Sequence, residues 1–283
     1  MLDAYYKKPG FIVDYRHSCT VNHPDISDFH LHSRFEIYFF ISGSVNYFIE
    51  KKMYPLKYGD LLVIRNNEIH KPSFLDNSPY ERIVIHFDPS IPRIFNTENY
   101  DLLNCFTNRP AGEKNKINLS EKQKKEILDI FKRIEILNGE PSDEAKLLKL
   151  TAFIELLVFI NRAFNHDDAV EETVNMPKRL QPILDFIENN LEGDLSLNRI
   201  EKEFYINGSY LSRLFKKHTG SNLHEYIIYK RISRAQTLIS KGYSCTQACL
   251  MSGFNDYSNF SKIFKGTVGL SPQAYKKRIA TNR

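Results

Sequence analysis

The spacing of apolar residues changes near Leu119, and this change constrains the fold more than any other feature of the chain. Before Leu119, β-branched and aromatic residues occur in short runs that end at turn-forming residues, a pattern typical of strands. After it, apolar residues recur at three- and four-residue steps, which indicates amphipathic helices. Strands are expected at 35–41, 45–49, 61–64 and 82–87. The chain is therefore predicted to begin with a small β-barrel or sandwich and to continue as helices.

Two helices are predicted directly after the barrel. Ser120 can cap the first, and Pro141-Ser142 begins the second, which extends to about Phe164. The second helix is so widely apolar that it must pack against the first helix, the barrel or a second copy of the chain. Its apolar stripe consists of Leu147, Leu150, Ile154, Leu157 and Val158. We expect the two helices to form an antiparallel pair that makes a homodimer.

An acidic segment without periodicity separates these helices from the rest of the chain. Behind it, helices are predicted at about 177–190, 196–204, 208–218, 222–240, 245–251, 256–265 and 272–279. The expected domains are a β-barrel at 1–117, a helical dimerisation segment at 118–165, a linker at 166–176 and an all-α domain at 177–283. The predicted fold class is multi-domain α+β.

Basic charge is concentrated in the last third of the chain. Residues 176–283 carry 17 Lys and Arg against 8 Asp and Glu, whereas residues 1–175 carry 22 against 26. Because phosphate neutralisation requires Lys and Arg on one surface, this asymmetry is typical of a nucleic-acid-binding module attached to another domain. Charge alone fits a solvated basic face equally well, so the helix pattern has to decide between the two.

The basic region contains two units in which a short helix, a tight turn and a second helix follow one another. They run from Leu197 to His218 and from Thr246 to Lys265. This is the plan of a helix-turn-helix, whose second helix enters the major groove of DNA. Helical spacing directs the following candidate DNA-binding residues outward: Ser209, Ser212, Arg213 and Lys216 in the first unit, and Tyr257, Ser258, Ser261, Lys262 and Lys265 in the second.

A helix of about 19 residues separates the two units and spans roughly 28 Å. With the thickness of the flanking elements added, the two groove-facing helices are expected near one DNA turn apart, roughly 34 Å. One chain would then read two successive major grooves.

Four spaced segments of this region are distinctive: residues 210–220, 231–239, 253–265 and 269–275. The third reads Gly253-Phe-Asn-Asp-Tyr-Ser-Asn-Phe-Ser-Lys-Ile-Phe-Lys265. Together they resemble the signature of the AraC/XylS family of bacterial transcription regulators, over roughly residues 178–279. The resemblance implies a seven-helix domain in which a long helix joins two helix-turn-helix units. Glu201 stands where the family usually has a small Ala, which questions how tightly the first unit closes.

A second constellation lies in the barrel, where His30, His32, Glu36 and His70 are spaced for a shared site. In an extended strand, residues 30, 32 and 36 share a face, and His70 can complete the set from another strand. The spacing resembles the cupin motif, which predicts a cupin-like barrel. In catalytic cupins these positions hold a divalent metal such as zinc, whereas in AraC-like sensor domains similar residues often persist without metal. Both interpretations stay open.

The same strand offers a lining for an effector pocket. Tyr38 and Phe40 share the face of Glu36, and His86 lies on a later strand. The predicted pocket therefore consists of His30, His32, Glu36, Tyr38, Phe40, His70 and His86. These residues suit a small polar effector such as a sugar, although Tyr38 and Phe40 fit plain barrel core equally well.

We interpret the chain as a DNA-binding transcription regulator with a sensor barrel, and not as an enzyme. The expected partners are double-stranded DNA, the small-molecule effector, a second copy of the chain and RNA polymerase. No apolar run approaches the ~18 residues of a membrane-spanning helix, and the four cysteines form no disulfide framework, so we expect a cytoplasmic protein. The alternative is a cupin metalloenzyme with an appended DNA-binding domain, since no other catalytic motif occurs.

Overall fold

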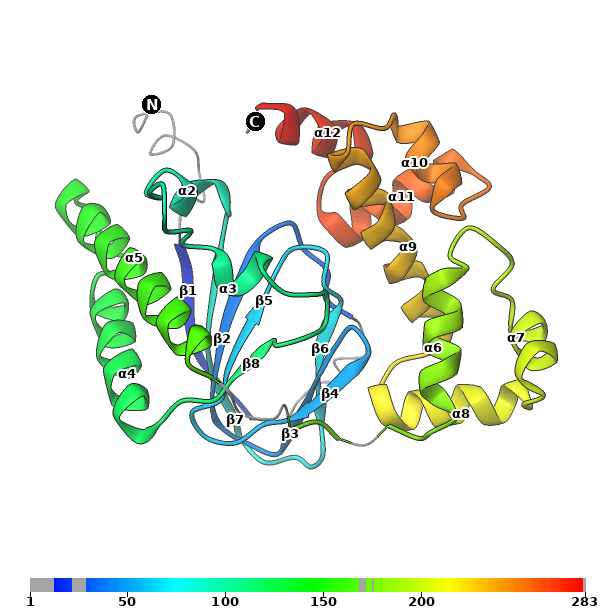
Figure 1. Ribbon diagram of the computed structural model, residues 1–283, viewed down its shortest axis with the longest axis horizontal. Helices are drawn as coiled ribbons and strands as arrows, with labels where there is room; N and C mark the ends of the chain where they lie inside the picture. The colour runs from blue at the N-terminus through cyan, green and yellow to red at the C-terminus, as the bar shows by residue number, and fades with distance from the viewer. Residues whose placement is uncertain (1–12, 22–28, 168–171, 175, 282–283) are drawn as a thin grey trace.

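The computed structural model describes residues 13–21, 29–167, 172–174 and 176–281. It contains an N-terminal β-sheet domain, two long helices against one side of that domain, and a C-terminal helical domain (Figure 1). This arrangement confirms the predicted multi-domain α+β class. The predicted linker, 166–176, lies partly outside the described residues. None of the described helices combines the length and the apolar character needed to cross a membrane.

In the described part of the chain, eight strands form two antiparallel sheets with the orders β1-β7-β2-β5-β8 and β4-β3-β6. The strands are β1 (Val13–Thr20), β2 (Phe35–Ser42), β3 (Val45–Ile49), β4 (Lys52–Pro55), β5 (Leu61–Ile64), β6 (His70–Phe74), β7 (Tyr80–Phe87) and β8 (Lys116–Ile117). The short helices α2 (Ser90–Arg93) and α3 (Asn104–Thr107) lie between β7 and β8. The four predicted runs correspond to β2, β3, β5 and β7.

Strand β2 is buried on both faces. Phe35, Ile37 and Phe39 pack in the cluster that includes the two long helices, and the alternate positions point into the space between the sheets. A strand covered on both sides needs apolar residues at nearly every position, which explains the continuous apolar character of 35–41. Glu36 interrupts this run, and its buried carboxylate therefore needs polar partners.

Helices α4 (Glu121–Ile136) and α5 (Asp143–Asn165) cover the outer face of the five-stranded sheet (Figure 1). As predicted, the Ser120 side chain caps α4. Aromatic side chains join the helices to the sheet: the ring centroids of Phe153 on α5 and Phe87 on β7 lie 4.9 Å apart. The helices are thus part of the N-terminal domain's core.

The two helices run antiparallel, as predicted. Arg133 pairs with Glu155 at 2.7 Å, and Arg162 pairs with Glu126 at 2.9 Å, so residues later in α5 meet residues earlier in α4. These exposed ion pairs contribute little stability, but they report the register of the helix pair.

The apolar stripe predicted on α5 has two different environments. Leu150 and Leu157 are buried against the sheet domain, whereas Leu147 and Val158 are exposed and Ile154 is partly buried. Much of the stripe therefore serves the barrel itself, because the sheet needs a cover on its outer face. The large apolar side chains left exposed on α4 and α5 are Ile136, Leu147, Leu148 and Val158.

All seven predicted helices of the C-terminal domain are present. They are α6 (Leu180–Asn189), α7 (Leu197–Phe204), α8 (Gly208–Thr219), α9 (Leu223–Ser240), α10 (Cys245–Met251), α11 (Tyr257–Val268) and α12 (Pro272–Thr281). Side chains define where the second helix of each unit begins. Asn207 accepts a hydrogen bond from Tyr210 N at the start of α8, and Asp256 accepts one from Asn259 N at the start of α11.

Glu201, the position that departs from the family pattern, is accommodated by Gly208. The Glu201 Oε1 atom accepts a hydrogen bond from the backbone N–H of Gly208, at the first turn of α8. A Cβ atom on residue 208 would lie only 2.6 Å from that oxygen and 2.6 Å from Leu197. Because residue 208 on α8 is a glycine, the larger side chain of Glu201 on α7 fits beside it. The two helices of the first unit can therefore pack against each other.

Gly253 lies in the turn of the second unit and should not tolerate a side chain. Its φ is +83°, and an added Cβ would lie 2.1 Å from the carbonyl oxygen of Leu191. We expect Gly253→Ala to lower the free energy of unfolding by more than about 2 kcal/mol, from the left-handed backbone and the collision with backbone.

Gly266, inside α11, is the matched control because no atom lies within 4 Å of an added Cβ. Gly266→Ala should raise the free energy of unfolding by about 0.5–1 kcal/mol. Urea unfolding of the full chain, followed by helical circular dichroism, measures both. Equal midpoints for Gly253→Ala and the unsubstituted chain would contradict the account of this turn.

Candidate functional site

The outer face of α8 presents polar and basic side chains. Leu211 and Phe215 are fully buried, so they attach the inner face to the core. The predicted residues lie on the other side: Ser209, Arg213 and Lys216 are exposed, and Ser212 is partly buried. Hydroxyl and cationic groups on one exposed helix face are the groups that contact base edges and phosphates.

Helix α11 repeats this arrangement in the second unit. Phe260 and Phe264 are fully buried. The predicted residues Tyr257, Ser258, Lys262 and Lys265 are exposed, and Ser261 is partly buried. The Tyr257 ring also packs on Phe260, with centroids 5.7 Å apart, so this tyrosine has a structural contact besides any contact with DNA.

Helix α9 connects the two units within one apolar core. Its 18 residues span about 27 Å at the helical rise. Buried residues of α8, α9 and α11 belong to the same cluster, including Phe215, Tyr226 and Phe260. The relative placement of the two exposed faces is therefore set by packing rather than by a flexible connection.

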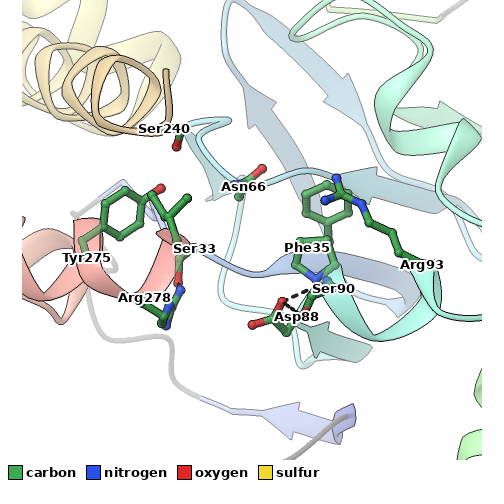
Figure 2. A pocket seen from close by; sticks show the side chains of 11 residues that line it. Ser33, Phe35, Asn66, Asp88, Ser90, Arg93, Ser240, Tyr275 and Arg278 are labelled. Atoms are coloured by element: carbon green, nitrogen blue, oxygen red, sulfur yellow. Dashed lines mark hydrogen bonds between the residues drawn. The ribbon is translucent and has the colours of Figure 1, made fainter. Parts of the chain in front are cut away.

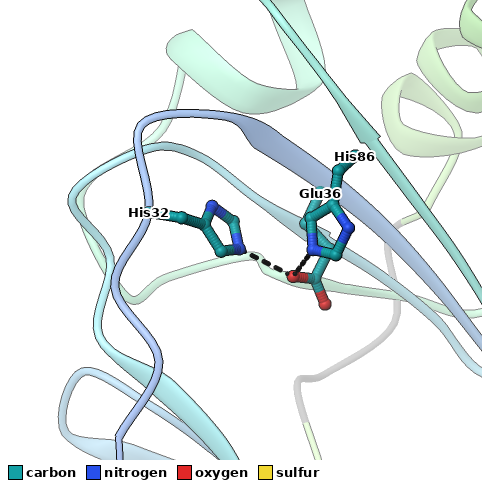
Figure 3. Close-up of side chains that lie close together, drawn as sticks. All are labelled: His32, Glu36 and His86. Carbon is teal, nitrogen blue, oxygen red and sulfur yellow. Dashed lines mark hydrogen bonds and ion pairs between the residues drawn. The ribbon is translucent and has the colours of Figure 1, made fainter. Parts of the chain in front are cut away.

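In the barrel, two histidines converge on one carboxylate oxygen (Figure 3). The Nε2 atoms of His32 and His86 each lie 2.9 Å from Glu36 Oε2. Glu36 on β2 and His86 on β7 are directly opposed in the antiparallel register, so their side chains leave the sheet on the same face. Ligand atoms of the three residues lie within 4.8 Å of one another, and imidazole nitrogen with carboxylate oxygen is a donor set for zinc-like metals.

His70 and His30, the other two residues predicted for the shared site, have different surroundings. His70 on β6 is fully buried, with Nε2 3.3 Å from Glu36 Oε2. His30 is exposed, its backbone pairs with His70, and the two ring centroids lie 5.7 Å apart. The prediction that residues 30, 32 and 36 share one strand face is wrong, because β2 begins only at Phe35. His86 contributes the ligand atom that the motif spacing assigned to His30.

The histidines keep Glu36 charged despite its burial. Burial raises the pKa of this carboxyl, but His70, His32 and His86 outweigh that effect and hold the pKa well below its usual range. Burial lowers the pKa of His70, but the charge of Glu36 outweighs it and raises the pKa of that imidazole. For His32 the loss of hydration prevails, and its pKa is lowered.

Tyr38 and Phe40 lie in the packed core between the sheets, with 1% and 2% of their surface exposed. The hydroxyl groups of Tyr38 and Tyr80 are 2.6 Å apart and satisfy each other. Tyr47 from β3 donates a long hydrogen bond of 3.4 Å to Glu36 Oε1. The cluster of Glu36 and its histidines therefore lies next to a layer of tightly packed aromatic side chains.

The barrel and the C-terminal domain share one apolar core. The barrel contributes Phe29, Leu31, Phe48, Met53 and Ile69 to the cluster that contains the helices of the helix-turn-helix units. The Phe29 ring lies 5.8 Å from that of Tyr226 on α9, centroid to centroid. Phe29 and Leu31 flank His30 in the chain, and Ile69 precedes His70. The segments that carry the histidines thus also contact the helices, a connection that no sequence signal indicated.

Lys230 of α9 is buried beside this shared core. Its ammonium group donates to Glu50, at the turn between β3 and β4, and to Glu188 of α6 at 2.9 Å. Glu50 has a positive φ of 57°, and its other oxygen accepts from Ile69 N at 2.8 Å. Burial lowers the pKa of Lys230, but the two carboxylates outweigh it and raise the pKa, so the lysine is charged.

A cavity of about 280 Å³ lies between the barrel and α12 (Figure 2). Ser33, Asn66 and Arg93 line it from the barrel side, and Tyr275 and Arg278 line it from α12. Arg278 donates to the Ser33 hydroxyl across the domain boundary. Hydroxyl, amide and guanidinium groups around one space are suited to a small polar molecule.

Two family models match the chain in separate regions. The model described as an AraC-like ligand binding domain matches residues 19–97, and the one described as a helix-turn-helix domain matches residues 200–278. The first therefore covers the histidine cluster, and the second covers α8 to α11.

Relatives of known name match a part or most of the chain. The Msm operon regulatory protein of Streptococcus mutans is 27% identical over 53% of this chain and 54% of its own, so the chain spans about half the length of that relative. The activator RhaR of Mannheimia succiniciproducens is 20% identical over 88% of this chain and 87% of its own. The multiple antibiotic resistance protein MarA of Salmonella typhimurium is 31% identical over 34% of this chain and 77% of its own. Among solved structures, Vibrio cholerae ToxT bound to an unsaturated fatty acid is 14% identical over 95% of this chain and 96% of that chain, with a TM-score of 0.39.

The buried ion pair at the domain boundary predicts unequal effects for two neighbouring lysines. Lys230→Met removes the ammonium group and leaves Glu50 buried without its partner, which should lower the free energy of unfolding by about 3–5 kcal/mol. Lys51 also pairs with Glu188 but is partly exposed, so Lys51→Met should cost no more than about 1 kcal/mol. Urea unfolding of the full chain compares the two. Similar losses for both variants would show that Glu50 does not depend on Lys230.

Proposed function

The chain belongs to the AraC family of transcription regulators, and on this premise we propose that it binds double-stranded DNA in a sequence-specific manner through α8 and α11. The observation that carries the proposal is that α8 and α11 each expose a polar and basic face, and that both helices pack with α9 in one apolar core. The concentration of basic residues in 176–283 supports it, because phosphates attract that surface whatever the DNA sequence.

Within these faces we assign different roles to different side chains. Arg213 and Lys262 lie near the middle of α8 and α11, and both are exposed, so they are the base-reading candidates. The neighbouring Ser209, Ser212, Ser258 and Ser261 offer short hydroxyl contacts. Lys216 and Lys265 lie in the last turns, and we assign them to phosphates.

We propose that the barrel controls this DNA-binding domain in response to a small polar effector. The supporting observation is that the residues next to the histidines pack on the helices: Phe29 contacts Tyr226, and Lys71, which follows His70, donates to Ser221 at 2.7 Å. The cavity between the barrel and α12 adjoins the same segment through Ser33, and its polar lining suits a sugar-sized molecule. The segments that carry the histidines therefore contact α9 directly, and they also contact the turn between α8 and α9.

A second copy of the chain is the proposed partner of α4 and α5. Ile136, Leu147 and Leu148 are 66%, 52% and 49% exposed on these helices, which is costly for a helix pair in water. An isologous contact between two copies would cover them. As a regulator at a promoter, the dimer would act on RNA polymerase.

The enzyme alternative is not favoured. The Msm operon regulatory protein and the activator RhaR, two of the relatives that match, are named as regulators. A regulator needs only reversible binding at this site.

Substitutions on the two groove-facing helices test base reading. Arg213→Ala and Lys262→Ala should each weaken binding to DNA selected by the full chain by about 1–3 kcal/mol, with a smaller loss on random DNA. Lys217, exposed in the last turn of α8, is also assigned to a phosphate, and Lys217→Ala is the control because the loss of a phosphate contact weakens binding to both kinds of DNA alike. Fluorescence anisotropy at fixed salt measures the affinities. Equal loss of selected and random DNA for Arg213→Ala would exclude that residue from base reading.

Sedimentation tests the proposed dimer. The full chain should sediment as a dimer at micromolar concentration, and Leu147→Glu combined with Val158→Glu should convert it to a monomer, because charges would be buried at the contact. Leu75 is 62% exposed in the loop after β6, and Leu75→Glu is the control that should leave the dimer intact. A monomeric full chain, with and without DNA, would contradict the proposal.

A further inference from the structure

We propose that the barrel holds one divalent transition-metal ion of the zinc class, bound by His32, Glu36 and His86 with His70 as the fourth donor. The donor set differs from the one that the sequence spacing predicts, because His86 replaces His30. The inference goes beyond the proposed function, since metal binding can be measured without DNA.

The geometry of the cluster fits such an ion. Three imidazole Nε2 atoms lie 2.9, 2.9 and 3.3 Å from one carboxylate oxygen. Two ligands on a tetrahedral zinc ion, each bound at 2.0–2.2 Å, are separated by roughly 3.3 Å. Small rotations of the side chains would therefore open a coordination site between atoms that already point at one another (Figure 3).

The hydrogen bonds of two rings leave lone pairs facing the carboxylate. His32 Nδ1 lies 2.9 Å from the carbonyl oxygen of Arg34, and His70 Nδ1 lies 2.8 Å from that of Glu68. A carbonyl oxygen only accepts hydrogen bonds, so each Nδ1 must carry the proton. In a neutral ring the Nε2 atom then has only a lone pair, and it faces a carboxylate oxygen that also only accepts. His70 Nε2 is in fact a buried ring nitrogen without a well-formed hydrogen bond among the described residues.

A shared metal ion suits this arrangement, because the three rings and the carboxylate already lie close together. The ring centroids of His32 and His70 are 5.0 Å apart, and those of His32 and His86 are 4.8 Å apart. One metal ion would accept all the lone pairs and neutralise Glu36. Donation from Nδ1 to a backbone carbonyl is also the usual support of a metal-binding histidine.

Access and register favour His86 over His30 as a ligand. His32 and His86 keep 27% and 22% of their side-chain surface exposed, which leaves a route for an ion to a carboxylate that is 4% exposed. The β2–β7 register holds His86 directly opposite Glu36. The group whose ligand atoms lie within 4.8 Å of one another consists of His32, Glu36 and His86.

Cobalt titration of the full-length chain tests the site. The chain is prepared without an affinity tag, stripped with a chelator and dialysed before Co²⁺ is added. We expect saturation at about one Co²⁺ per chain, with the intense visible absorption of a four-coordinate ion that Zn²⁺ then displaces. His86→Asn should remove this spectrum and weaken binding by more than about 100-fold. His30→Asn, the matched control, should keep both.

Three results would overturn the proposal: no four-coordinate spectrum with the unsubstituted chain, a spectrum that survives His86→Asn, or one that His30→Asn abolishes. The first does not depend on any variant folding. Circular dichroism of the same samples reports whether each variant is folded, and anisotropy measures DNA binding separately. A chain that binds DNA but no metal would end this inference and leave the proposed regulator intact.

Discussion

The arrangement of the barrel and the C-terminal domain depends on the ion pairs made by the buried ammonium group of Lys230. This group lies between the buried carboxylate of Glu50 from the barrel and the partly exposed carboxylate of Glu188 from α6, and Glu50 would be buried at greater cost without it. Glu50 also binds the backbone of Ile69, the residue before His70, so one ion pair links α9, α6, a hairpin turn and the strand of the histidine cluster. Apolar contacts supply the area of the interface, but they are non-directional, and the ion pair selects one orientation.

A second constraint comes from β2, which has to serve two cores at once. Its outward residues pack under α4 and α5, so that sheet face is closed to solvent. Its inward residues continue into packed aromatic side chains, except at Glu36. A carboxylate in such a place persists only with partners, and β7 and β6 supply them as His86 and His70. The polar cluster and the helical cover are thus two consequences of the same buried strand.

Local patterns in the sequence were sufficient for much of the fold. The helices of the C-terminal domain have clear periodicity and capping residues such as Asn207 and Asp256, so their ends could be predicted closely. The exposed faces of α8 and α11 followed from the same periodicity. The short strand β4 was missed, because Lys52–Pro55 contains polar residues and proline. For β6 only a strand that carries His70 was expected, without bounds, because His70–Phe74 also contains polar residues and proline. The exchange of His30 for His86 could not be predicted either. It depends on where β2 begins and on its register with β7, and both are set by tertiary packing.

The shared core has a consequence for how such a protein can change over evolutionary time. Effector-binding and DNA-binding domains are often treated as interchangeable. In this chain, however, Phe29, Phe48 and Met53 of the barrel belong to the apolar core of the C-terminal domain. A gene fusion that joined this C-terminal domain to an unrelated barrel would expose Tyr226 and its neighbours to water or to a surface that does not fit them. New ligand specificities should therefore arise by substitution within the existing barrel, with paired changes across the boundary, more readily than by wholesale domain shuffling.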